Sequence, residues 1–582
     1  MAQSAEQQKR YHVSKDFKGV NTKANRTAIG ADEFSWLNNV QPIGFANMKV
    51  VKSENEVANV AFSANVVSLH SVSINLANTN SDLVVAMLEN GAAQYVNLTA
   101  GNTLGNIASA STFSNSGVQV TQWKNERVLF IDPVKGYKNW DGTNLVSVGS
   151  ILSVNITNGG SGYNSAPTVT ISATQETGGV NANAVASISN GAVTSITLDE
   201  AGSGYTDPAN VTVTITGGGP NAANATANVT GFSQVGQAIA TFSGRTWISD
   251  NRTIYYSAAD SYNDFGSVSA GNVTLTDSTL HGNIVQIISA NNFLYVYGSD
   301  SINVISDVRV SATTGETLFS NTNISASIGS NLKYAIYPYF RSILFMNRYG
   351  MYALVGSTTS KISDALDGVF PNIDFSSPIS GGQVLINNIL CAAFNFKTNY
   401  FTGTDRYVQA VFFEKKWFFT TQDEELRFLV SSPVGGLINA YGTTGTNFKH
   451  LYANSSAAIA STVQSALLPM GDPIRDKQAL KVGMEATTID QGAVFTVTVD
   501  NENRESAPIS LASAVNWQNN NYQNIPWTNN LSNTVLWINV GYFLYKSDAQ
   551  QYGKYLGLTI NCDAAGVTYN GFNFEHELRA RY

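Results

Sequence analysis

Residues 136–142, Gly136-Tyr137-Lys138-Asn139-Trp140-Asp141-Gly142, place an Asp-Gly pair directly after an aromatic run. Such a pair is a strong signal for the turn of a β-hairpin, because these residues tolerate the positive φ that tight turns need. Short apolar runs precede it, as in Leu83–Leu88 and Arg127–Ile131, and Asn, Gly and Ser clusters separate them. Strands at this spacing predict a sandwich, a barrel or a propeller, and the 136–142 turn resembles the corner of a propeller blade.

The composition of the 582-residue chain favours strands over helices. Charged residues make up 13%, whereas aromatic residues reach 11%. The charged share is about half of that in typical proteins. Tyr, Phe, Val, Ile and Thr suit a pleated, half-buried surface, and Gly, Asn and Asp supply turns. A chain of this length exceeds what one hydrophobic core supports. We therefore predict an all-β protein of several domains.

The order of these patterns divides the chain into five expected segments. We predict a β-propeller-like core, an inserted small β-module and a C-terminal β-sandwich-like region. The segments are 1–44, an N-terminal arm and short helix; 45–150, the first part of the propeller; 151–232, the inserted Gly/Asn/Thr-rich repeat module; 233–450, the remainder of the propeller; and 451–582, the C-terminal β-domain. The sequence leaves the number of blades open.

Two segments favour helices by local criteria. Residues 32–39 offer Asp32 as an N-cap, and Phe34 and Leu37 would share one helix face. Residues 457–468 are rich in Ala and Leu, which propensity alone assigns to a helix. We therefore expect the short helix of the N-terminal arm at 32–39, and a weaker helical tendency at 457–468.

The inserted segment contains an internal repeat. Gly160-Ser161-Gly162-Tyr163 returns as Gly202-Ser203-Gly204-Tyr205, and a strand-like run follows each copy. The period is about 40 residues. Residues 151–232 contain no Lys or Arg. Each copy is interpreted as strands around a glycine-rich turn with a packed tyrosine.

Charge and hydropathy narrow the function classes. The formal net charge is −8, and the densest basic stretches, Lys9-Arg10 and Glu414–Trp417, are short. A nucleic-acid-binding role would need a longer basic patch. The first eight residues lack the apolar core of a secretory signal, and the apolar stretches are too short to span a bilayer. We therefore expect synthesis in the cytoplasm.

No motif for a cofactor, a metal or a nucleophile is present. The histidines, which are His12, His70, His281, His450 and His576, are dispersed and lack a second ligand at metal spacing. Cys391 and Cys562 match no metal or redox spacing, so we expect buried free thiols. The prediction is a protein that is not an enzyme, with no catalytic residues, cofactor or metal.

Paired carboxylates are the strongest enzymatic alternative, because a glycosidase uses two acids that flank the scissile bond. The candidates are Asp423, Glu424 and Glu425; Asp364 and Asp367; and Glu575 and Glu577. Adjacent acids in a polar loop are usually solvated, and Glu575 and Glu577 alternate as on a solvent-facing strand edge. The alternative requires two acids among Asp423, Glu424 and Asp364 to converge within roughly 5 to 9.5 Å in a cleft.

Several short segments are informative as an ordered set. They are Phe17–Thr22; Ala31–Val40; Gly244–Trp247 with Ile254–Ser257 and Asp264-Phe265; Asn347–Tyr352 with Lys361–Ser363; and Lys415–Trp417. In pattern and order they resemble the tail nozzle proteins of short-tailed bacteriophages, and they are spread over most of the chain. The repeat module also looks like repeats that decorate phage structural proteins. The insertion of roughly 80 residues departs from the nozzle pattern.

The resemblance implies a structural virion protein in the phage tail. Nozzle proteins are built on a β-propeller with additional β-domains and form a hexameric ring below the portal and the adaptor protein. That ring is the conduit through which double-stranded DNA leaves without specific binding. The implied partners are other copies of the chain in a homohexamer, the tail adaptor and, at the tip, tail fibres and the host cell surface. The family has no catalytic residues to carry over.

Two physical points agree with a conduit, and two alternatives stay open. Six subunits would carry 6 × −8 = −48, which repels DNA, and a surface with few charges and many aromatic residues suits subunit contacts. One alternative is a receptor-binding adhesin or tail-fibre-like carbohydrate-binding protein, in which the Gly-Ser-Gly-Tyr module and exposed Tyr and Trp bind sugar. The other is a polysaccharide-degrading enzyme that uses the acids above.

Overall fold

A computed structural model describes the chain from residue 9 to residue 579 with internal gaps. The described ranges are 9–205, 208–217, 221–230, 234–276, 280–488, 493–512 and 541–579, with two-residue pieces at 514–515, 517–518, 524–525, 527–528, 534–535 and 537–538. Within them the regular elements are strands β1–β51 and the single-turn 3-10 helices η1 (Pro208–Asn210), η2 (Lys333–Ala335), η3 (Asp364–Leu366) and η4 (Phe370–Asn372). The all-β prediction is confirmed.

The centre of the molecule is a ring of seven propeller blades, each made of four antiparallel strands; six blades are separate four-stranded sheets, and the blade β32–β35 is part of a larger sheet. The first four blades are β6 (Val66–Leu76), β7 (Thr79–Leu88), β8 (Ala93–Asn97), β9 (Thr103–Ala108); β10 (Gln119–Trp123), β11 (Arg127–Asp132), β12 (Gly136–Trp140), β13 (Leu145–Ser147); β20 (Ala238–Phe242), β21 (Arg245–Asp250), β22 (Thr253–Tyr256), β23 (Gly271–Thr274); and β24 (Ile284–Ala290), β25 (Phe293–Gly298), β26 (Ile302–Val310), β27 (Thr317–Ser325). The last three are β28 (Ile336–Tyr339), β29 (Ser342–Asn347), β30 (Gly350–Val355), β31 (Thr358–Lys361); β32 (Ser380–Ile386), β33 (Ile389–Thr398), β34 (Arg406–Phe413), β35 (Lys416–Thr420); and β36 (Leu429–Val434), β37 (Leu437–Thr444), β38 (Asn447–Asn454), β5 (Ser53–Ala61).

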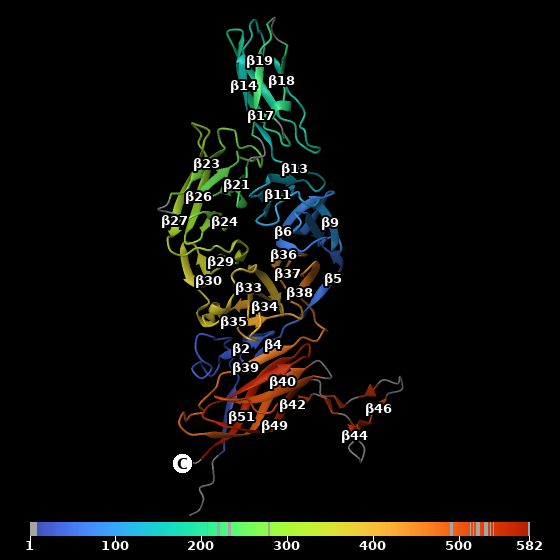
Figure 1. Cartoon of the computed structure of the whole chain (residues 1–582), viewed down its shortest axis with the longest axis vertical. Coiled ribbons are helices and arrows are strands. Elements are labelled where there is room, and N and C mark those ends of the chain that lie inside the picture. The colour runs from blue at the N-terminus through green and yellow to red at the C-terminus, as the bar shows by residue number, and fades with distance from the viewer. Residues whose placement is uncertain are drawn as a thin grey trace, which may run out of the picture.

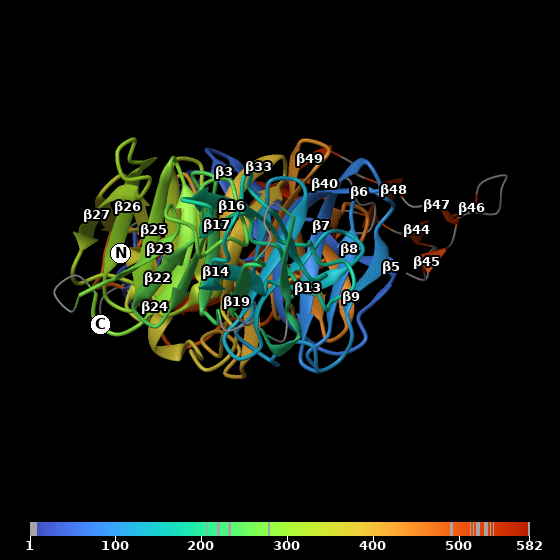
Figure 2. The same ribbon diagram turned by 90° about the horizontal axis from the view of Figure 1, so that it is seen from above.

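The ring is closed in two ways. The innermost strands β6, β10, β20, β24, β28, β32 and β36 contact one another in that order, and β36 contacts β6. The last blade takes its outer strand from the beginning of the chain, because β5 pairs with β38. The blades β6–β9 and β24–β27 lie on opposite sides of the molecule in both views (Figures 1 and 2). The propeller expected from sequence is therefore present, with seven blades.

The hairpin turn predicted at Asp141-Gly142 is present. Strands β12 and β13 pair with Trp140 opposite Leu145. The Asp141 carboxylate accepts hydrogen bonds from the backbone N–H groups of Thr143 and Asn144, at 2.8 and 2.7 Å. This arrangement is the self-capping that makes Asp a frequent turn residue.

Residues 150–230 leave the propeller after β13, return before β20, and form the inserted module at one end of the molecule (Figure 1). Its strands are β14 (Ser150–Asn158) and β19 (Asn224–Thr230) in one sheet, and β17 (Ala192–Glu200), β16 (Asn183–Ser189), β15 (Thr168–Ile171) and β18 (Val213–Thr216) in the other. The Asn263 amide donates to the carbonyl oxygen of Gly202 at 2.6 Å, so the module is fastened to the neighbouring blade.

The opposite end of the molecule is a β-sandwich that combines both ends of the chain (Figure 1). One sheet contains β3 (Val40–Gly44), β4 (Asn47–Val50), β51 (Thr568–Leu578), β40 (Lys477–Thr488) and β49 (Gly541–Gly553), and β1 (Arg10–Ser14) pairs with β51. The other contains β2 (Phe34–Asn38), β39 (Ser461–Ser465), β50 (Leu556–Cys562), β41 (Val494–Asn501) and β42 (Ile509–Ala512). The short strands β43 (Ala514–Val515) to β48 (Trp537–Ile538), with β44 (Trp517–Gln518), β45 (Asn524–Ile525), β46 (Trp527–Thr528) and β47 (Thr534–Val535), form three two-stranded pairs.

Propeller and sandwich share one continuous sheet. Strand β2 pairs in parallel with β35 of the sixth blade, with Asn38 opposite Phe419, so nine strands run from β32 to β42. The hydrophobic core is continuous as well, because one cluster of buried residues contains Phe394 of the blade and Phe495 and Phe572 of the sandwich. Burial of such side chains contributes about 1.5–3 kcal/mol each. The two units are therefore held by a common sheet and a common core.

Three local predictions about the ends of the chain are wrong. Residues 32–39 do not form a helix; they contain β2, in which a register shift between Phe34 and Trp36 brings Phe34 and Leu37 to the same buried side. Residues 457–468 contain strand β39, which pairs with β2 and β50. Of the expected arm, residues 10–14 are strand β1, and residues 1–8 lie outside the described residues.

Candidate functional site

Four of the eight segments that carry the nozzle resemblance meet where the propeller joins the sandwich. We call residues 17–22, 34–38, 361–368 and 416–419 the joint. The Val20 N–H donates to the carbonyl oxygen of Trp417 at 2.8 Å, and the Phe34 N–H donates to that of Gly19 at 2.9 Å. The Trp417 indole N–H donates to the carbonyl oxygen of Ile362 at 2.9 Å. Segments separated by up to 400 residues of sequence thus hydrogen-bond to one another.

Glycine is required at two close approaches in the joint. Gly19 has φ +101°, and a Cβ there would lie 2.8 Å from the Trp417 carbonyl oxygen. A Cβ on Gly368 would lie 2.0 Å from the carbonyl oxygen of Thr22, whose own N–H donates to Ala365 at 2.7 Å. Both neighbours are backbone atoms, which cannot move aside without breaking these hydrogen bonds.

Aromatic packing fills the interior of the joint. Phe17 is fully buried, with its ring centroid 5.8 Å from those of both Phe34 and Phe572. Trp417 is 1% exposed and packs against Phe412 at 4.8 Å between centroids. These side chains connect the segment before β2 with both sandwich sheets and with the sixth blade.

The 244–257 segments of the resemblance form a second buried cluster, inside the third blade. The Arg245 guanidinium donates to the carbonyl oxygens of Ser257 at 2.6 Å and Ser269 at 2.8 Å. Arg245 is 2% exposed, and burial lowers its pKa. Thr246 N–H donates to the Ser257 hydroxyl at 2.8 Å. Arg245, at the start of β21, therefore binds both ends of the loop that connects β22 to β23, far from the joint.

The candidate acids Asp423 and Glu424 belong to the closure of the propeller. Backbone N–H groups of both residues donate to the Glu54 carboxylate of β5, each at 3.1 Å. The Ser53 hydroxyl donates to Asp423, and the buried Lys449 ammonium donates to Glu424 at 3.1 Å. These contacts hold the loop after β35 on the closing strand. Glu425 is exposed and follows in the same loop.

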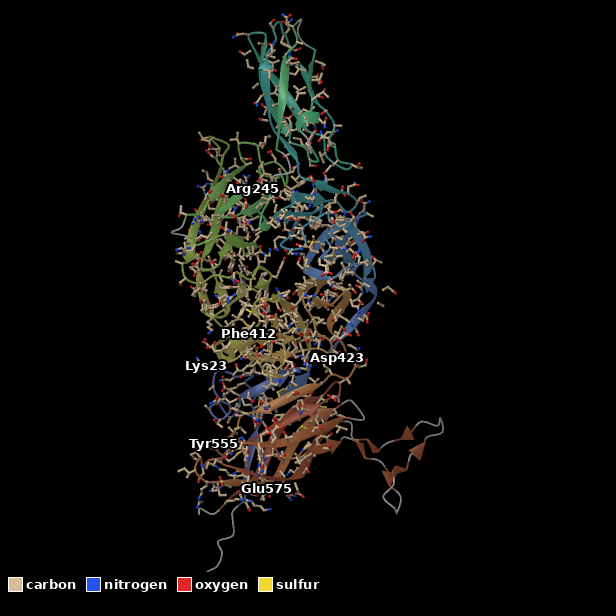
Figure 3. All side chains as sticks on the ribbon, in the orientation of Figure 1. Lys23, Arg245, Phe412, Asp423, Tyr555 and Glu575 are labelled. Atoms are coloured by element: carbon tan, nitrogen blue, oxygen red, sulfur yellow. The ribbon has the colours of Figure 1, made fainter. Side chains whose placement is uncertain are left out.

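The remaining candidate acids lie elsewhere. Asp364 and Asp367 both pair with Lys361, at 3.7 and 2.6 Å. Glu575 of β51 pairs with Lys9 at 2.9 Å. Figure 3 places Asp423 beside the propeller and Glu575 in the sandwich, well apart. Glu577 lies two residues further along β51, opposite Gln478 of β40. Each acid group thus has a separate position in the fold.

The cysteines and histidines are dispersed as the sequence indicated. Cys391 and Cys562 are buried free thiols, and burial raises the pKa of Cys391 to about 12. Across the described ranges, no three His, Cys, Asp or Glu side chains gather as metal ligands would. No helix in these ranges is long and apolar enough to cross a membrane.

Both repeat tyrosines of the module are core residues. Tyr163 is 4% exposed and Tyr205 is fully buried. The Tyr163 hydroxyl accepts from the N–H of Ala223 at 2.8 Å, and the Tyr205 hydroxyl accepts from that of Ala182 at 2.9 Å. The packed tyrosines expected from the repeat are confirmed. Because they are buried, these two tyrosines are not available as stacking platforms for a sugar.

Sequence reasoning missed a cavity on the propeller axis. It has a volume of about 610 Å³ and is lined by residues of all seven innermost strands, among them His70, Gln119, Thr241 and Gln286. Lys333 and Tyr334 of η2 also line the cavity. The lining runs from Leu69 to Ile438, so no local sequence motif could have indicated the site.

The titratable groups of the cavity are perturbed by burial. Burial lowers the pKa of Lys333 to about 8. Burial and the Lys333 charge lower the pKa of His70 to about 3, so its ring is neutral at physiological pH. Burial raises the pKa of Tyr334. Lys333 is therefore the cavity group that can carry charge at neutral pH.

Comparisons with known proteins identify no family. No family model and no curated protein matches the chain. Among solved structures, the extracellular domain of a protein described as the one-component system BT4673 of B. thetaiotaomicron is 8% identical with a TM-score of 0.34; the match covers 70% of this chain and 41% of that one. A glycoside hydrolase family 43 arabinoxylan arabinofuranohydrolase from Bacillus subtilis is 9% identical with a TM-score of 0.20; the match covers 73% of this chain and 96% of that one.

Proposed function

We propose that the chain is a structural virion protein, the subunit of a ring-shaped nozzle of a short phage tail, and not an enzyme. In this role six copies form a homohexamer below the tail adaptor, and the ring conducts the genome during ejection. Tail fibres and the host cell surface are the further partners at the tip. The proposal starts from the ordered sequence resemblance.

The observation that carries the proposal is the position of the resembling segments. Phe17–Thr22, Ala31–Val40, Lys361–Ser363 and Lys415–Trp417 all contribute to the joint, where Gly19, Trp417 and Ile362 are connected by backbone and indole hydrogen bonds. These four of the eight resembling segments contact one another although they are far apart in sequence. Their convergence supports an interpretation in which they specify how the sandwich is fixed to the propeller, which is an architectural role.

A rigid connection suits a component that must keep its shape while DNA passes. The joint is crossed by the nine-stranded sheet and by the shared core, so bending it would expose buried side chains such as Trp417 and Phe17. Loss of a buried aromatic side chain costs about 3–5 kcal/mol. This cost favours a propeller and a sandwich that move as one body.

The conduit itself is assigned to the axis of the ring and not to the axis of one propeller. The cavity within the propeller, about 610 Å³, has the size of a small-molecule pocket and cannot admit a duplex. A ring of net charge −48 (6 × −8) would repel the phosphate backbone and would not retain passing DNA.

Sedimentation velocity of the purified chain, with a 30-base-pair duplex as a second component, tests the proposal. We expect a species of 6 × 62.3 kDa = 373.8 kDa, and no DNA co-sedimenting at about 0.15 M salt. A subunit variant that loosens the joint, Trp417→Ala, should lower the yield of folded hexamer. A monomer or trimer at all concentrations, or DNA binding that persists at this salt concentration, would contradict the proposal.

A further inference from the structure

The cavity on the propeller axis has the dimensions of a ligand site. Its volume of about 610 Å³ falls within the range of roughly 300–1,000 Å³ that small-molecule sites occupy. All seven innermost strands contribute to its wall, so its shape is fixed by the closed ring. The proposed nozzle role assigns no function to it.

The charges in the wall have one sign. Lys333 is the cationic side chain of the lining, and the lining contains no Asp or Glu among the described residues. A half-buried ammonium without a carboxylate in the same wall attracts an anion more strongly than a surface lysine does, because the effective dielectric constant is lower. One lysine balances one negative charge, which favours a monoanion over phosphate.

The Lys333 ammonium is oriented and retains donor capacity. Its Nζ donates to the carbonyl oxygen of Gly117 at 3.0 Å and lies 5.4 Å from the Tyr334 ring centroid. An ammonium group has three donors. Within the described residues the structure gives this nitrogen a single hydrogen-bond acceptor, so two donors can bind a carboxylate.

Neutral polar groups line the same cavity from adjacent blades. Thr121, Thr241 and Ser289 bring hydroxyl groups from β10, β20 and β24. The Gln286 amide donates to the Gln119 amide oxygen at 3.1 Å, so these two side chains are held in place. Hydroxyl and amide groups both donate and accept, which matches the alcohol groups of a sugar.

We propose that the central cavity of the propeller binds a monoanionic sugar acid of the hexuronate class, with its carboxylate at Lys333 and its hydroxyl groups at Thr121, Thr241 and Gln119. The apolar side chain of Ile287 and the ring of Tyr334 supply the surfaces that pack against the sugar ring. The proposal does not depend on the nozzle function.

Binding should depend on pH through Lys333. Its pKa is about 8 in the free protein, so the ammonium is lost as the pH rises through that value. The other titratable side chains that face it are His70 of β6, Tyr334 beside it and Tyr337 of β28; burial keeps all three neutral between pH 7 and 9. Affinity for the carboxylate should therefore fall from pH 7 to pH 9.

Isothermal titration calorimetry of the full chain with glucuronate tests the proposal, with glucose and inorganic phosphate as comparison ligands. We expect glucuronate to bind at least about tenfold more tightly than either, which corresponds to about 1.4 kcal/mol. Lys333→Met should weaken glucuronate binding at least about tenfold, whereas the exposed control Lys135→Met should leave it unchanged.

Wild-type titrations at pH 7 and pH 9 give a second readout that does not depend on a variant being folded. A loss of affinity of about tenfold over this interval is expected. The proposal is overturned if glucuronate does not bind, if glucose or phosphate binds as tightly, if the affinity is the same at both pH values, or if folded Lys333→Met binds within twofold of wild type.

Discussion

The joint and the central cavity are both built from segments far apart in sequence, but they use their polar groups differently. In the joint, the N–H groups of Val20 and Phe34 and the Trp417 indole donate to acceptors of the same chain, and Gly19 allows direct backbone contact. In the cavity, Lys333 has donors left over and the wall has one sign of charge. Polar groups that are paired within the chain stabilise the joint, whereas the remaining donors of Lys333 can bind a ligand.

The largest expected effect is at Gly19. Gly19→Ala should lower the free energy of unfolding by about 3–4 kcal/mol, because a left-handed backbone and contact with the Trp417 carbonyl both penalise Cβ. Gly101→Ala is the matched control, since Gly101 has φ +68° and open space around it, and should cost about 1–2 kcal/mol. Urea denaturation measures both, and equal losses would show that the close approach is unimportant.

Trp417→Phe should have the next largest effect, about 2–3 kcal/mol. The change removes the indole N–H that donates to the Ile362 carbonyl oxygen, and it leaves space among buried side chains. Trp36, half-buried on β2 of the same sheet, provides the control variant Trp36→Phe, which should cost about 1 kcal/mol. If both variants lose the same stability, the indole hydrogen bond has no special role in the joint.

The free energy of unfolding should depend on acid pH through His70, which lines the cavity. The pKa of His70 is about 3 in the folded chain and 6.5 in the unfolded chain, so only the unfolded state takes up this proton between those values. Stability is therefore lost as the pH falls from 6.5 toward 3. In His70→Gln, the loss of unfolding free energy on acidification should be smaller than in wild type by on the order of 1–2 kcal/mol. The exposed control His281→Gln should lose as much as wild type. Urea midpoints at pH 7 and pH 4.5 measure the difference.

Lys333 should change the free energy of unfolding in the alkaline range, by less than His70 changes it in the acid range. Its pKa is lowered from 10.5 to about 8 on folding, so the unfolded state binds more protons between these values and wild-type stability rises with pH there. Relative to Lys333→Met, wild type should gain about 1 kcal/mol from pH 8 to pH 10. A constant difference between the two proteins across this interval would contradict a buried ammonium.

Substitution of Asp364 should have the smallest effect on the free energy of unfolding. Its exposed carboxylate lies 3.7 Å from Lys361, and such a pair contributes at most about 1 kcal/mol. Asp364→Asn should change the free energy of unfolding by less than about 0.5 kcal/mol and leave the oligomeric mass unchanged. A polysaccharide-degrading activity that is present in wild type and absent in this variant would restore the enzymatic alternative.

Sequence reasoning succeeded where local chemistry decides structure. Asp141-Gly142 specifies a turn through its own side chain and backbone, and the buried Tyr163 and Tyr205 follow from the repeat. It failed at residues 32–39, because Phe34 and Leu37, three positions apart, suit a helix face as well as a bulged strand. Only the partners β35 and β39, far along the chain, decide between the two.

The joint and the cavity mark two further limits of sequence reasoning. The segments around Gly19 and Trp417 carry part of the resemblance to nozzle proteins. Their mutual contact, however, depends on the parallel pairing of β2 with β35. The environment of Lys333 arises only when seven blades close into a ring, and nothing in residues near Lys333 indicates a burial that lowers its pKa. The number of blades depended on the same long-range closure.

Electron microscopy of the purified 582-residue chain tests the proposed ring of six subunits. We predict class averages with six-fold symmetry around an open axial channel wide enough for duplex DNA, in which each subunit keeps its propeller and sandwich in one fixed arrangement. A trimeric rod without an axial channel, or a monomer whose propeller and sandwich adopt variable arrangements, would contradict it.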